Sequence, residues 1–227
     1  MISIRVVERD KHIPAPSVDH AKQRLRRCLM ARRAALQYED RCRLSAAITA
    51  HVCSMSAFQT SHTVMVYMAL PYEVQTAELI TAAQRQHKRV VVPVVTSTGL
   101  VAVACPSDTH HFRRGSFGIL EPCHNAEVVT PTSIDWVLVP GVGFDPYGMR
   151  LGYGKGYYDR FLRQLAPHAR YGGVAYHTQV VPFVPYMPHD IRMQFLVTEQ
   201  GILPCLPPRL TNRSGHGRPG SDKGEHR

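Results

Sequence analysis

The chain has 227 residues, of which 44% are hydrophobic and 19% charged, and its formal net charge is +10. This length suffices for one domain with a sizeable core, and the apolar fraction excludes a wholly disordered chain. No apolar run approaches the roughly 20 residues that a membrane helix needs, and the first residues lack the apolar segment of a secretory signal. We therefore expect a cytoplasmic protein that does not associate with the membrane.

The positive charge is concentrated in two segments. Residues 20–43 hold eight basic and two acidic residues, and residues 209–227 hold five and two. The intervening residues 44–208 are almost balanced, with eleven and ten. A basic chain can indicate a nucleic-acid partner, and that hypothesis predicts salt-sensitive binding that is lost when residues 209–227 are deleted. The neutral body of the chain disfavours it, so we expect no nucleic-acid partner.

Composition also predicts the domain organisation. Residues 1–19 contain two prolines and no sustained hydrophobic period, which is typical of a flexible extension. Residues 208–227 are rich in glycine, serine and charge, and such a segment cannot bury enough apolar area to offset the entropy of ordering. We predict a flexible N-terminal extension (1–19), one domain (20–207) and a disordered basic tail (208–227).

The six cysteines show no C-x-x-C spacing, so a zinc or redox motif is not indicated. In a chain without a secretory signal, reduced thiols are expected rather than disulfides. The cysteines therefore do not help to choose a function.

Taken in chain order, the hydrophobic pattern alternates between helices and short apolar strands. Helices are predicted at residues 20–36, 38–57, 76–87 and 155–165. Strands are predicted at residues 63–70, 89–95, 100–104, 135–142, 172–176 and 195–198. Pro93 suggests that its strand lies at a sheet edge or ends there, and the 100–104 strand is expected to pair with it. Apolar strands alternating with helices indicate an α/β fold whose sheet is covered on both faces.

The most informative segment is a glycine loop between the 135–142 strand and the 155–165 helix. Three glycines stand at alternate positions, where the backbone can approach a ligand closely: Gly152, Gly154 and Gly156. Their amide groups, near a helix N-terminus, suit an anion. The pattern is neither a P-loop, because no G-K-[ST] ends it, nor the dinucleotide fingerprint, because residue 157 is tyrosine. We predict a phosphate site; the alternative is a tight turn in which the glycines serve only the chain reversal.

Charged residues strengthen the phosphate interpretation. Arg150 and Lys155 bracket the loop with positive charge, and Asp159 is the one acid within reach. A carboxylate beside bound phosphate is a usual place for Mg²⁺. The loop therefore predicts a site for a phosphate together with a magnesium ion.

The run from Phe144 to Asp159, F-D-P-Y-G-M-R-L-G-Y-G-K-G-Y-Y-D, resembles the signature loop of the 5-formyltetrahydrofolate cyclo-ligases, also called methenyltetrahydrofolate synthetases. The family pattern is roughly F-D-x-x-G-x-R-L-G-x-G-x-G-Y-Y-D, and every fixed position is met. The resemblance extends over about residues 20–200 and includes the turn Phe117–Pro122. It implies an α/β fold of the NagB/RpiA/CoA-transferase type: a single three-layer domain with a mostly parallel central sheet and helices on both faces.

The basic N-terminal helix is also similar to the family, in which a Lys is followed four residues later by an Arg, as in Lys22 and Arg26. At about 100° per residue, Lys22, Arg26 and Arg33 fall within roughly 40° of one another. An adjacent apolar stripe is formed by Leu25, Leu29 and Leu36. The helix can therefore dock by its leucines and keep a cationic ridge beside the contact. The alternative is a solvated basic face, the commoner fate of such a run.

The resemblance implies a set of site residues from several segments. ATP would be bound by Lys22, Gln23, Arg24, Leu25, Arg26, Arg150, Leu151, Gly152, Tyr153, Gly154, Lys155, Gly156, Tyr157 and Tyr158. The folate would be bound by Arg26, Met68, Glu73, Tyr153, Gly154, Lys155, Gly156 and Tyr157. Arg150, Lys155 and Tyr157 would be the catalytic residues, and Asp159 and Asp190 would bind Mg²⁺.

Two of these acids have alternatives. Glu73 lies between the 63–70 strand and Thr76, which itself reads as a helix N-cap. A carboxylate suits a pterin, whose 2-amino and N3–H groups present adjacent donors; the alternative is an exposed loop acid. For Asp190, the alternative is a helix or turn cap.

The implied reaction is the ATP-dependent, irreversible cyclisation of 5-formyltetrahydrofolate to 5,10-methenyltetrahydrofolate, with release of ADP and phosphate. ATP would phosphorylate the formyl oxygen, and N10 would attack the activated carbon. The expected protein is a monomer that uses ATP and Mg²⁺, and its folate substrate can carry a polyglutamate chain. The rival is a related ATP-using enzyme on the same scaffold with another amide-like substrate.

Overall fold

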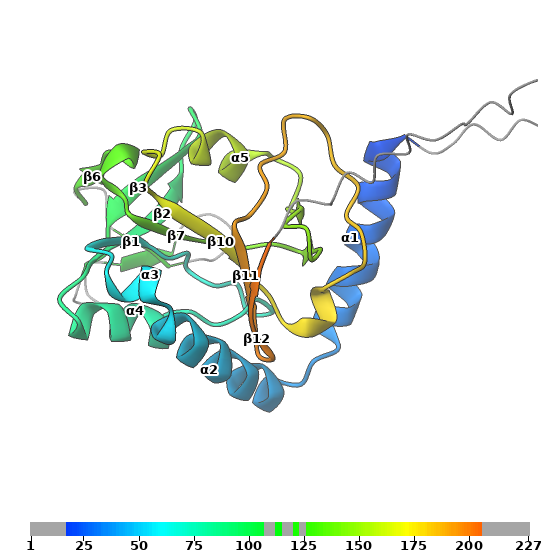
Figure 1. The fold of residues 1–227 in the computed structure, drawn as a ribbon, viewed down its shortest axis with the longest axis horizontal. Helices are drawn as coiled ribbons and strands as arrows, with labels where there is room; N and C mark the ends of the chain where they lie inside the picture. Colours follow the sequence, from blue (N-terminus) through cyan, green and yellow to red (C-terminus); the bar gives the residue numbers. More distant parts are fainter. Residues whose placement is uncertain (1–16, 107–111, 115–119, 123–125, 206–227) are drawn as a thin grey trace, which may run out of the picture.

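The computed structural model describes residues 17–106, 112–114, 120–122 and 126–205. The strands of its main sheet are β1 (Thr63–Met65), β2 (Arg89–Val95), β3 (Leu100–Ala104), β6 (Val128–Val129), β7 (Trp136–Val139), β10 (Arg170–Val174), β11 (Phe195–Thr198) and β12 (Gly201–Pro204). They form one eight-stranded sheet in the order β12-β11-β10-β7-β1-β2-β3-β6 (Figure 1). The predicted strands at 89–95, 100–104 and 195–198 are confirmed at both ends.

The centre of this sheet is parallel and its margins are antiparallel. β11, β10, β7, β1 and β2 pair in parallel, whereas β12, β3 and β6 pair antiparallel with their neighbours. Two small sheets stand apart: β4 (Phe112–Arg114) with β5 (Leu120–Pro122), and β8 (Gly143–Phe144) with β9 (Arg150–Leu151). Residues 117–119 of the predicted family turn lie outside the described residues, as do residues 1–16 of the predicted extension and the whole of the predicted tail. Residues 17–19, which are predicted to belong to the flexible extension, instead begin a helix, with Ser17 at its N-cap.

Helices lie on both faces of the sheet (Figure 1). They are α1 (Val18–Ala34), α2 (Tyr38–Ser54), α3 (Ser56–Gln59), α4 (Ala77–Arg85) and α5 (Tyr157–Leu162), with short 3-10 turns η3 (Pro131–Ser133) and η4 (His177–Gln179). Successive strand residues point to opposite faces, so Trp136 and Leu138 of β7 join the core beneath α2, α3 and α4. Val137 and Val139 join the core beneath α5. The predicted α/β fold with three layers is confirmed.

α1 packs against the β8–β9 hairpin. Leu29 is fully buried in a cluster with hairpin residues, and Leu25 packs against this cluster. A Cβ on Gly143 would lie 2.2 Å from Leu29 Cδ1, so only glycine allows the helix to approach this closely. Leu36 packs instead on the α2 side of the sheet. The three leucines of the predicted stripe therefore contact two different parts of the protein, and the first two dock α1 beside the glycine loop.

The first predicted strand is shorter than expected, and Pro93 is the reason. β1 ends at Met65 rather than at residue 70. The Val66 N–H still donates to Val91 O at 3.0 Å. The next bond of a parallel ladder would run from residue 93 to Val66 O, and proline has no N–H to donate. Pro93 therefore ends the β1–β2 ladder, but β2 is not an edge strand, because β3 pairs along its other side.

All four predicted helices have different limits in the structure, and two of the differences have a local cause. The 155–165 helix begins only at Tyr157, because Gly156 has a left-handed φ of 63°. The 38–57 helix is interrupted at Met55, whose ψ of 125° is extended. No helix of the described residues has both the length and the apolar character needed to span a membrane.

Candidate active site

α1 brings together segments that are far apart in the chain. Arg26 Nε donates to Gly152 O at 2.9 Å. One turn earlier, Lys22 Nζ pairs with Asp190 Oδ2 at 2.5 Å. The predicted cationic ridge is therefore not a solvated basic face: it holds the glycine loop and the 188–190 segment side by side.

The glycine loop requires glycine at two positions. Gly154 has a φ of 97° and Gly156 a φ of 63°, a region that other residues rarely occupy. The Arg26 guanidinium lies over the loop, 3.6 Å from where a Cβ on Gly154 would be. The following helix α5 has only six residues, so its dipole is weaker than a longer helix would provide. An anion at this loop would depend mainly on backbone N–H groups and on nearby cations.

The three predicted catalytic residues have different surroundings. Arg150 is largely buried, and its Nη2 pairs with Asp159 Oδ2 at 2.9 Å. Lys155 is exposed, and its ammonium makes no hydrogen bond or ion pair to any residue that the structure describes. The Tyr157 ring lies 5.3 Å from the Arg160 guanidinium. Lys155 is therefore available to a ligand, whereas Arg150 holds the loop in shape.

Several residues that the resemblance assigns to ligand binding also pack in the protein interior. Leu151 belongs to the cluster around Leu29, and Met68 packs against the core beneath α2. Tyr158 packs against the core beneath α5, and burial raises the pKa of its phenol. Gln23 and Arg24 are exposed on α1.

The two predicted magnesium ligands lie near each other, and both are paired with cations. Asp159 Oδ1 accepts from the N–H of Ile191, the residue after Asp190, at 3.0 Å. Asp190 also accepts from the Met187 N–H at 2.7 Å, so the turn-cap alternative holds as well. Burial raises the pKa of Asp190, but the hydrogen bonds from Lys22 and Met187 outweigh it, and the pKa lies below its usual range.

The described residues contain no group of three His, Cys, Asp or Glu side chains that could hold a metal ion by themselves. Mg²⁺ often binds through one or two carboxylates together with substrate phosphates. Two neighbouring carboxylates beside the glycine loop fit an ion that arrives with a nucleotide.

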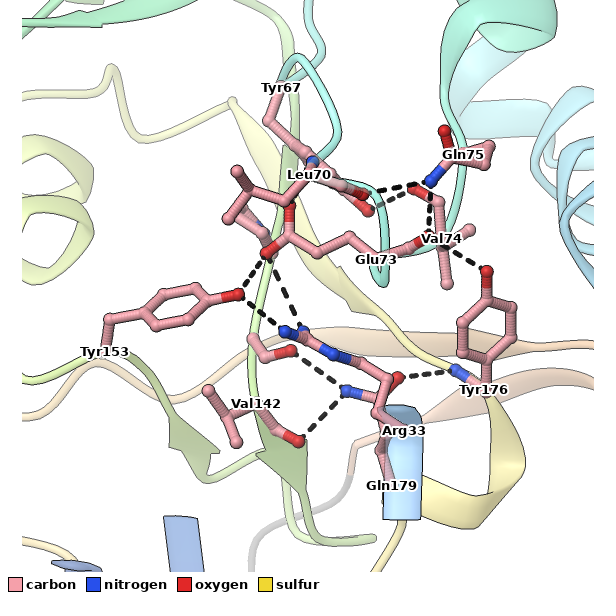
Figure 2. A network of polar contacts seen from close by, with 12 residues as sticks. Arg33, Tyr67, Leu70, Glu73, Val74, Gln75, Val142, Tyr153, Tyr176 and Gln179 are labelled. Carbon is pink, nitrogen blue, oxygen red and sulfur yellow. Dashed lines mark hydrogen bonds and ion pairs between the residues drawn. The ribbon is translucent and has the colours of Figure 1, made fainter. Parts of the chain in front are cut away.

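Glu73 is buried on a loop that is held rigidly (Figure 2). Its Oε2 accepts from the Leu70 N–H at 3.0 Å, and its own N–H donates to Leu70 O at 2.9 Å. The Gln75 side chain donates to the carbonyls of Leu70 and Glu73. The Tyr176 hydroxyl donates to Glu73 O at 2.9 Å. The alternative of an exposed loop acid is wrong, because the loop presents this carboxylate inside the protein.

The ends of the same loop are also fixed. The Tyr67 hydroxyl donates to Val74 O at 2.9 Å, and the Thr76 hydroxyl donates to Tyr67 O at 2.6 Å. Thr76 does stand at the predicted N-cap position of α4, but its side chain does not cap the helix. It fastens the loop to the end of the β1 segment instead.

A buried network joins α1, the glycine loop and the Glu73 loop (Figure 2). The Tyr153 hydroxyl donates to Glu73 Oε1 at 2.6 Å and accepts from Arg33 Nη2 at 2.8 Å. Arg33 Nη1 lies 3.7 Å from the same carboxylate oxygen. Burial, and then the charge of Glu73, raise the pKa of Tyr153 to about 12. The hydroxyl therefore keeps its proton and donates over the whole physiological pH range.

Sequence reasoning placed Arg33 on the cationic ridge but assigned it no role. The signal was the helical spacing that puts Arg33 on the side of Lys22 and Arg26. The pattern could not show that Tyr153 and Glu73 reach this arginine, because both come from distant parts of the chain.

Comparison with known proteins identifies the family of this chain. Residues 18–199 match the family model described as the 5-formyltetrahydrofolate cyclo-ligase family. The 5-formyltetrahydrofolate cyclo-ligase of Mus musculus is 28% identical over 196 residues, which cover 82% of this chain and 97% of that protein. The 5-formyltetrahydrofolate cyclo-ligase of Escherichia coli (strain K12) is 32% identical over 146 residues, which cover 63% and 80%. The NMR structure of Aquifex aeolicus 5,10-methenyltetrahydrofolate synthetase matches with a TM-score of 0.73 and 32% identity, covering 87% of this chain and 99% of that one.

Proposed function

The chain belongs to the 5-formyltetrahydrofolate cyclo-ligase family, and from this premise we propose that it uses ATP to convert 5-formyltetrahydrofolate to 5,10-methenyltetrahydrofolate. One structural observation carries the proposal. α1 holds the glycine loop by Arg26 and the 188–190 segment by Lys22, and Tyr153 of that loop reaches Glu73. A candidate phosphate site and a candidate pterin site are thus adjacent, as a reaction between ATP and a folate requires.

The chemistry explains why ATP is needed. The N5-formyl group is an amide, and its carbon is a poor electrophile. Transfer of the terminal phosphoryl group to the formyl oxygen makes that oxygen a leaving group. N10 then bonds to the formyl carbon and loses its proton, the carbon–oxygen bond breaks, and phosphate leaves with the oxygen. The products are ADP, phosphate and the methenyl folate.

The protein contributes mainly positioning and charge, as in other phosphoryl transfers. Lys155, which is exposed and whose ammonium makes no hydrogen bond or ion pair to the described residues, would neutralise charge on the transferring group. Arg26 and the loop N–H groups would hold the phosphates, and Arg150 would keep the loop in place through Asp159. Tyr157 would line the boundary between nucleotide and folate.

We also propose that Asp159 and Asp190 hold a magnesium ion when the nucleotide is bound. The ion would supply positive charge to the phosphate oxygens. Lys22 and Arg150 keep the two carboxylates in place before that happens.

On the folate side, Glu73 would accept from the 2-amino and N3–H groups of the pterin. Its loop is rigid before any ligand binds, so little ordering free energy is lost on binding. We further propose a monomer that accepts folates with a polyglutamate chain and binds neither nucleic acid nor membranes.

The test is an absorbance assay of the purified protein with Mg-ATP and 5-formyltetrahydrofolate. The methenyl product is expected to accumulate with one ADP released for each folate cyclised. ATP hydrolysis that is indifferent to 5-formyltetrahydrofolate, or stimulated only by a different amide-like substrate, would assign the site to the rival enzyme.

A further inference from the structure

Arg33 is a buried cation with unused donors. It is 4% exposed, and arginine is rarely buried to this extent unless its N–H groups are paired. Nη2 donates to the Tyr153 hydroxyl, but Nε and Nη1 have no hydrogen-bond partner among the residues that the structure describes. Since a buried donor without an acceptor is destabilising, Arg33 is suited to an acceptor that does not come from these residues.

The Tyr153 hydroxyl indicates what kind of group fits between Arg33 and Glu73 (Figure 2). On a single atom, it accepts from the arginine at 2.8 Å and donates to the carboxylate at 2.6 Å. Glu73 is anchored by the Leu70 N–H, and Arg33 is fixed within α1. The space between them is therefore matched to a group that has a donor and an acceptor side by side.

We propose that Arg33 and Glu73 together recognise the lactam edge of the substrate's pterin ring, with Arg33 donating to the 4-oxo oxygen. This inference rests on the proposed function, in which Glu73 accepts from the 2-amino and N3–H groups. The 4-oxo acceptor is adjacent to N3–H, so the edge presents two donors followed by one acceptor. Arg33 Nη1, 3.7 Å from Glu73 Oε1, supplies the donor at the third position.

Tyr153 holds this place until the ring binds. The residue is 44% exposed and stands between two glycines of the loop. It reaches the network through its hydroxyl, and its ring lies 5.8 Å from the Arg33 guanidinium. When the pterin enters, Arg33 and Glu73 exchange one hydroxyl for the lactam edge. Neither charge is left unpaired during the exchange of partners.

The test compares 5-formyltetrahydrofolate with its 4-amino-4-deoxy counterpart, in which an amino donor replaces the 4-oxo acceptor and ring atom N3 loses its hydrogen. We expect the wild-type protein to prefer the 4-oxo substrate by at least about 100-fold in kcat/KM, because the hydrogen bond from Arg33, a charged donor worth roughly 10- to 100-fold, and the one from N3–H to Glu73 are both lost. In Arg33→Met this preference is expected to fall roughly 10- to 100-fold, because the apolar side chain neither attracts the oxygen nor repels the amino group and only the loss of the N3–H bond to Glu73 remains. The KM for ATP is expected to stay within about twofold.

The matched control is Arg32→Met, which removes the same charge from the neighbouring, exposed position of α1 and is expected to keep the wild-type preference. If Arg33 had a purely structural role, its replacement would lower kcat/KM for both substrates alike. An unchanged preference in folded Arg33→Met therefore overturns the proposal. If Arg33→Met does not fold, Arg33→Gln is tested in its place. It keeps a neutral donor, so its preference for the 4-oxo substrate is expected to be smaller than that of the wild-type protein but not abolished. A preference as large as that of the wild-type protein would also overturn the proposal. Absence of 5-formyltetrahydrofolate turnover by the wild-type protein would instead contradict the proposed function.

Discussion

At the residue scale, the candidate site is organised by ion pairs between distant segments. Lys22 pairs with Asp190, Arg150 with Asp159, and Arg33 with Glu73. The side chains of all three pairs are at most 15% exposed. Removing one partner of such a pair leaves a charge without compensation in a poorly solvated place. These residues therefore hold the site together, and Lys155, which pairs with none of the described residues, is the better probe of chemistry.

Lys155→Ala is expected to lower kcat about 100-fold or more while the protein remains folded. The reason is that Lys155 would stabilise charge on the transferring phosphoryl group, yet its side chain is exposed. Steady-state kinetics and circular dichroism check both parts. Arg85→Ala, which removes an exposed charge from the last turn of α4, is the control. A near-normal kcat in Lys155→Ala would remove this residue from catalysis.

Asp135 provides a pH-dependent contribution to stability. Its Oδ2 accepts from the N–H groups of His62 and Thr63 at the start of β1, at 2.9 and 2.8 Å. Burial raises the pKa of Asp135, but the hydrogen bonds from Thr63, His62 and His168 outweigh it, and the pKa lies below its usual range. A carboxyl group with a lowered folded pKa stabilises the protein above its unfolded pKa of about 4, and this contribution is lost as the pH falls through the folded pKa.

We expect Asp135→Asn to lower the free energy of unfolding by about 1 kcal/mol at pH 7, with the deficit shrinking as the pH falls below the unfolded pKa of about 4. Urea unfolding of both proteins from neutral to acid pH measures the difference. A deficit that is the same at every pH would show that the charge of Asp135 is not responsible.

At the element scale, the ring of Phe144 determines how β8 sits on the sheet. A Cβ on Gly173 of β10 would lie 2.3 Å from Phe144 Cε1, and one on Gly141 would lie 2.5 Å from its Cζ. The ring thus fits only because glycine stands at both places. This contact fixes the hairpin that leads into the glycine loop, so packing in the sheet positions the site.

Gly173→Ala is expected to destabilise the protein by about 1–3 kcal/mol, because the added methyl group overlaps the buried ring. In the double variant with Phe144→Leu, the loss is expected to be smaller than the sum of the two single losses, because the smaller side chain makes room. Denaturant unfolding of the four proteins gives the coupling. Strict additivity would mean that the methyl group and the ring do not compete for space.

At the scale of the whole molecule, most of the net charge of +10 comes from two segments, residues 20–43 and 209–227. The basic segment 20–43 includes α1, where Lys22, Arg26 and Arg33 point at the candidate site and are held by protein acceptors. We propose that this part of the basic charge serves one small polyanion rather than a nucleic acid. The five basic residues of 209–227 are not accompanied by a comparable motif in the sequence.

Deleting residues 1–16 and 209–227 is expected to leave kcat and the KM for ATP within about twofold of the full chain. Residues 209–227 are too poor in apolar residues to contribute to a core, and residues 1–16 show no sustained hydrophobic period. The N-terminal cut should stop at residue 16 rather than 19, because Ser17 accepts from the His20 N–H at the start of α1. A tenfold rise in the KM for ATP on removal of 209–227 alone would show that the tail supplies charge to the nucleotide.

The sequence by itself determined the α/β class, three strands to the residue, the glycine loop and the docking of Leu25 and Leu29, because hydrophobic period, glycine spacing and charge act over short stretches of chain. It could not determine that Pro93 would end β1 early, since that depends on which strand β2 pairs with. Nor could it show the network of Arg33, Tyr153 and Glu73, whose members lie on three segments that only the order of the sheet brings together. Local patterns fix local structure, whereas contacts between distant side chains are decided by packing of the whole chain.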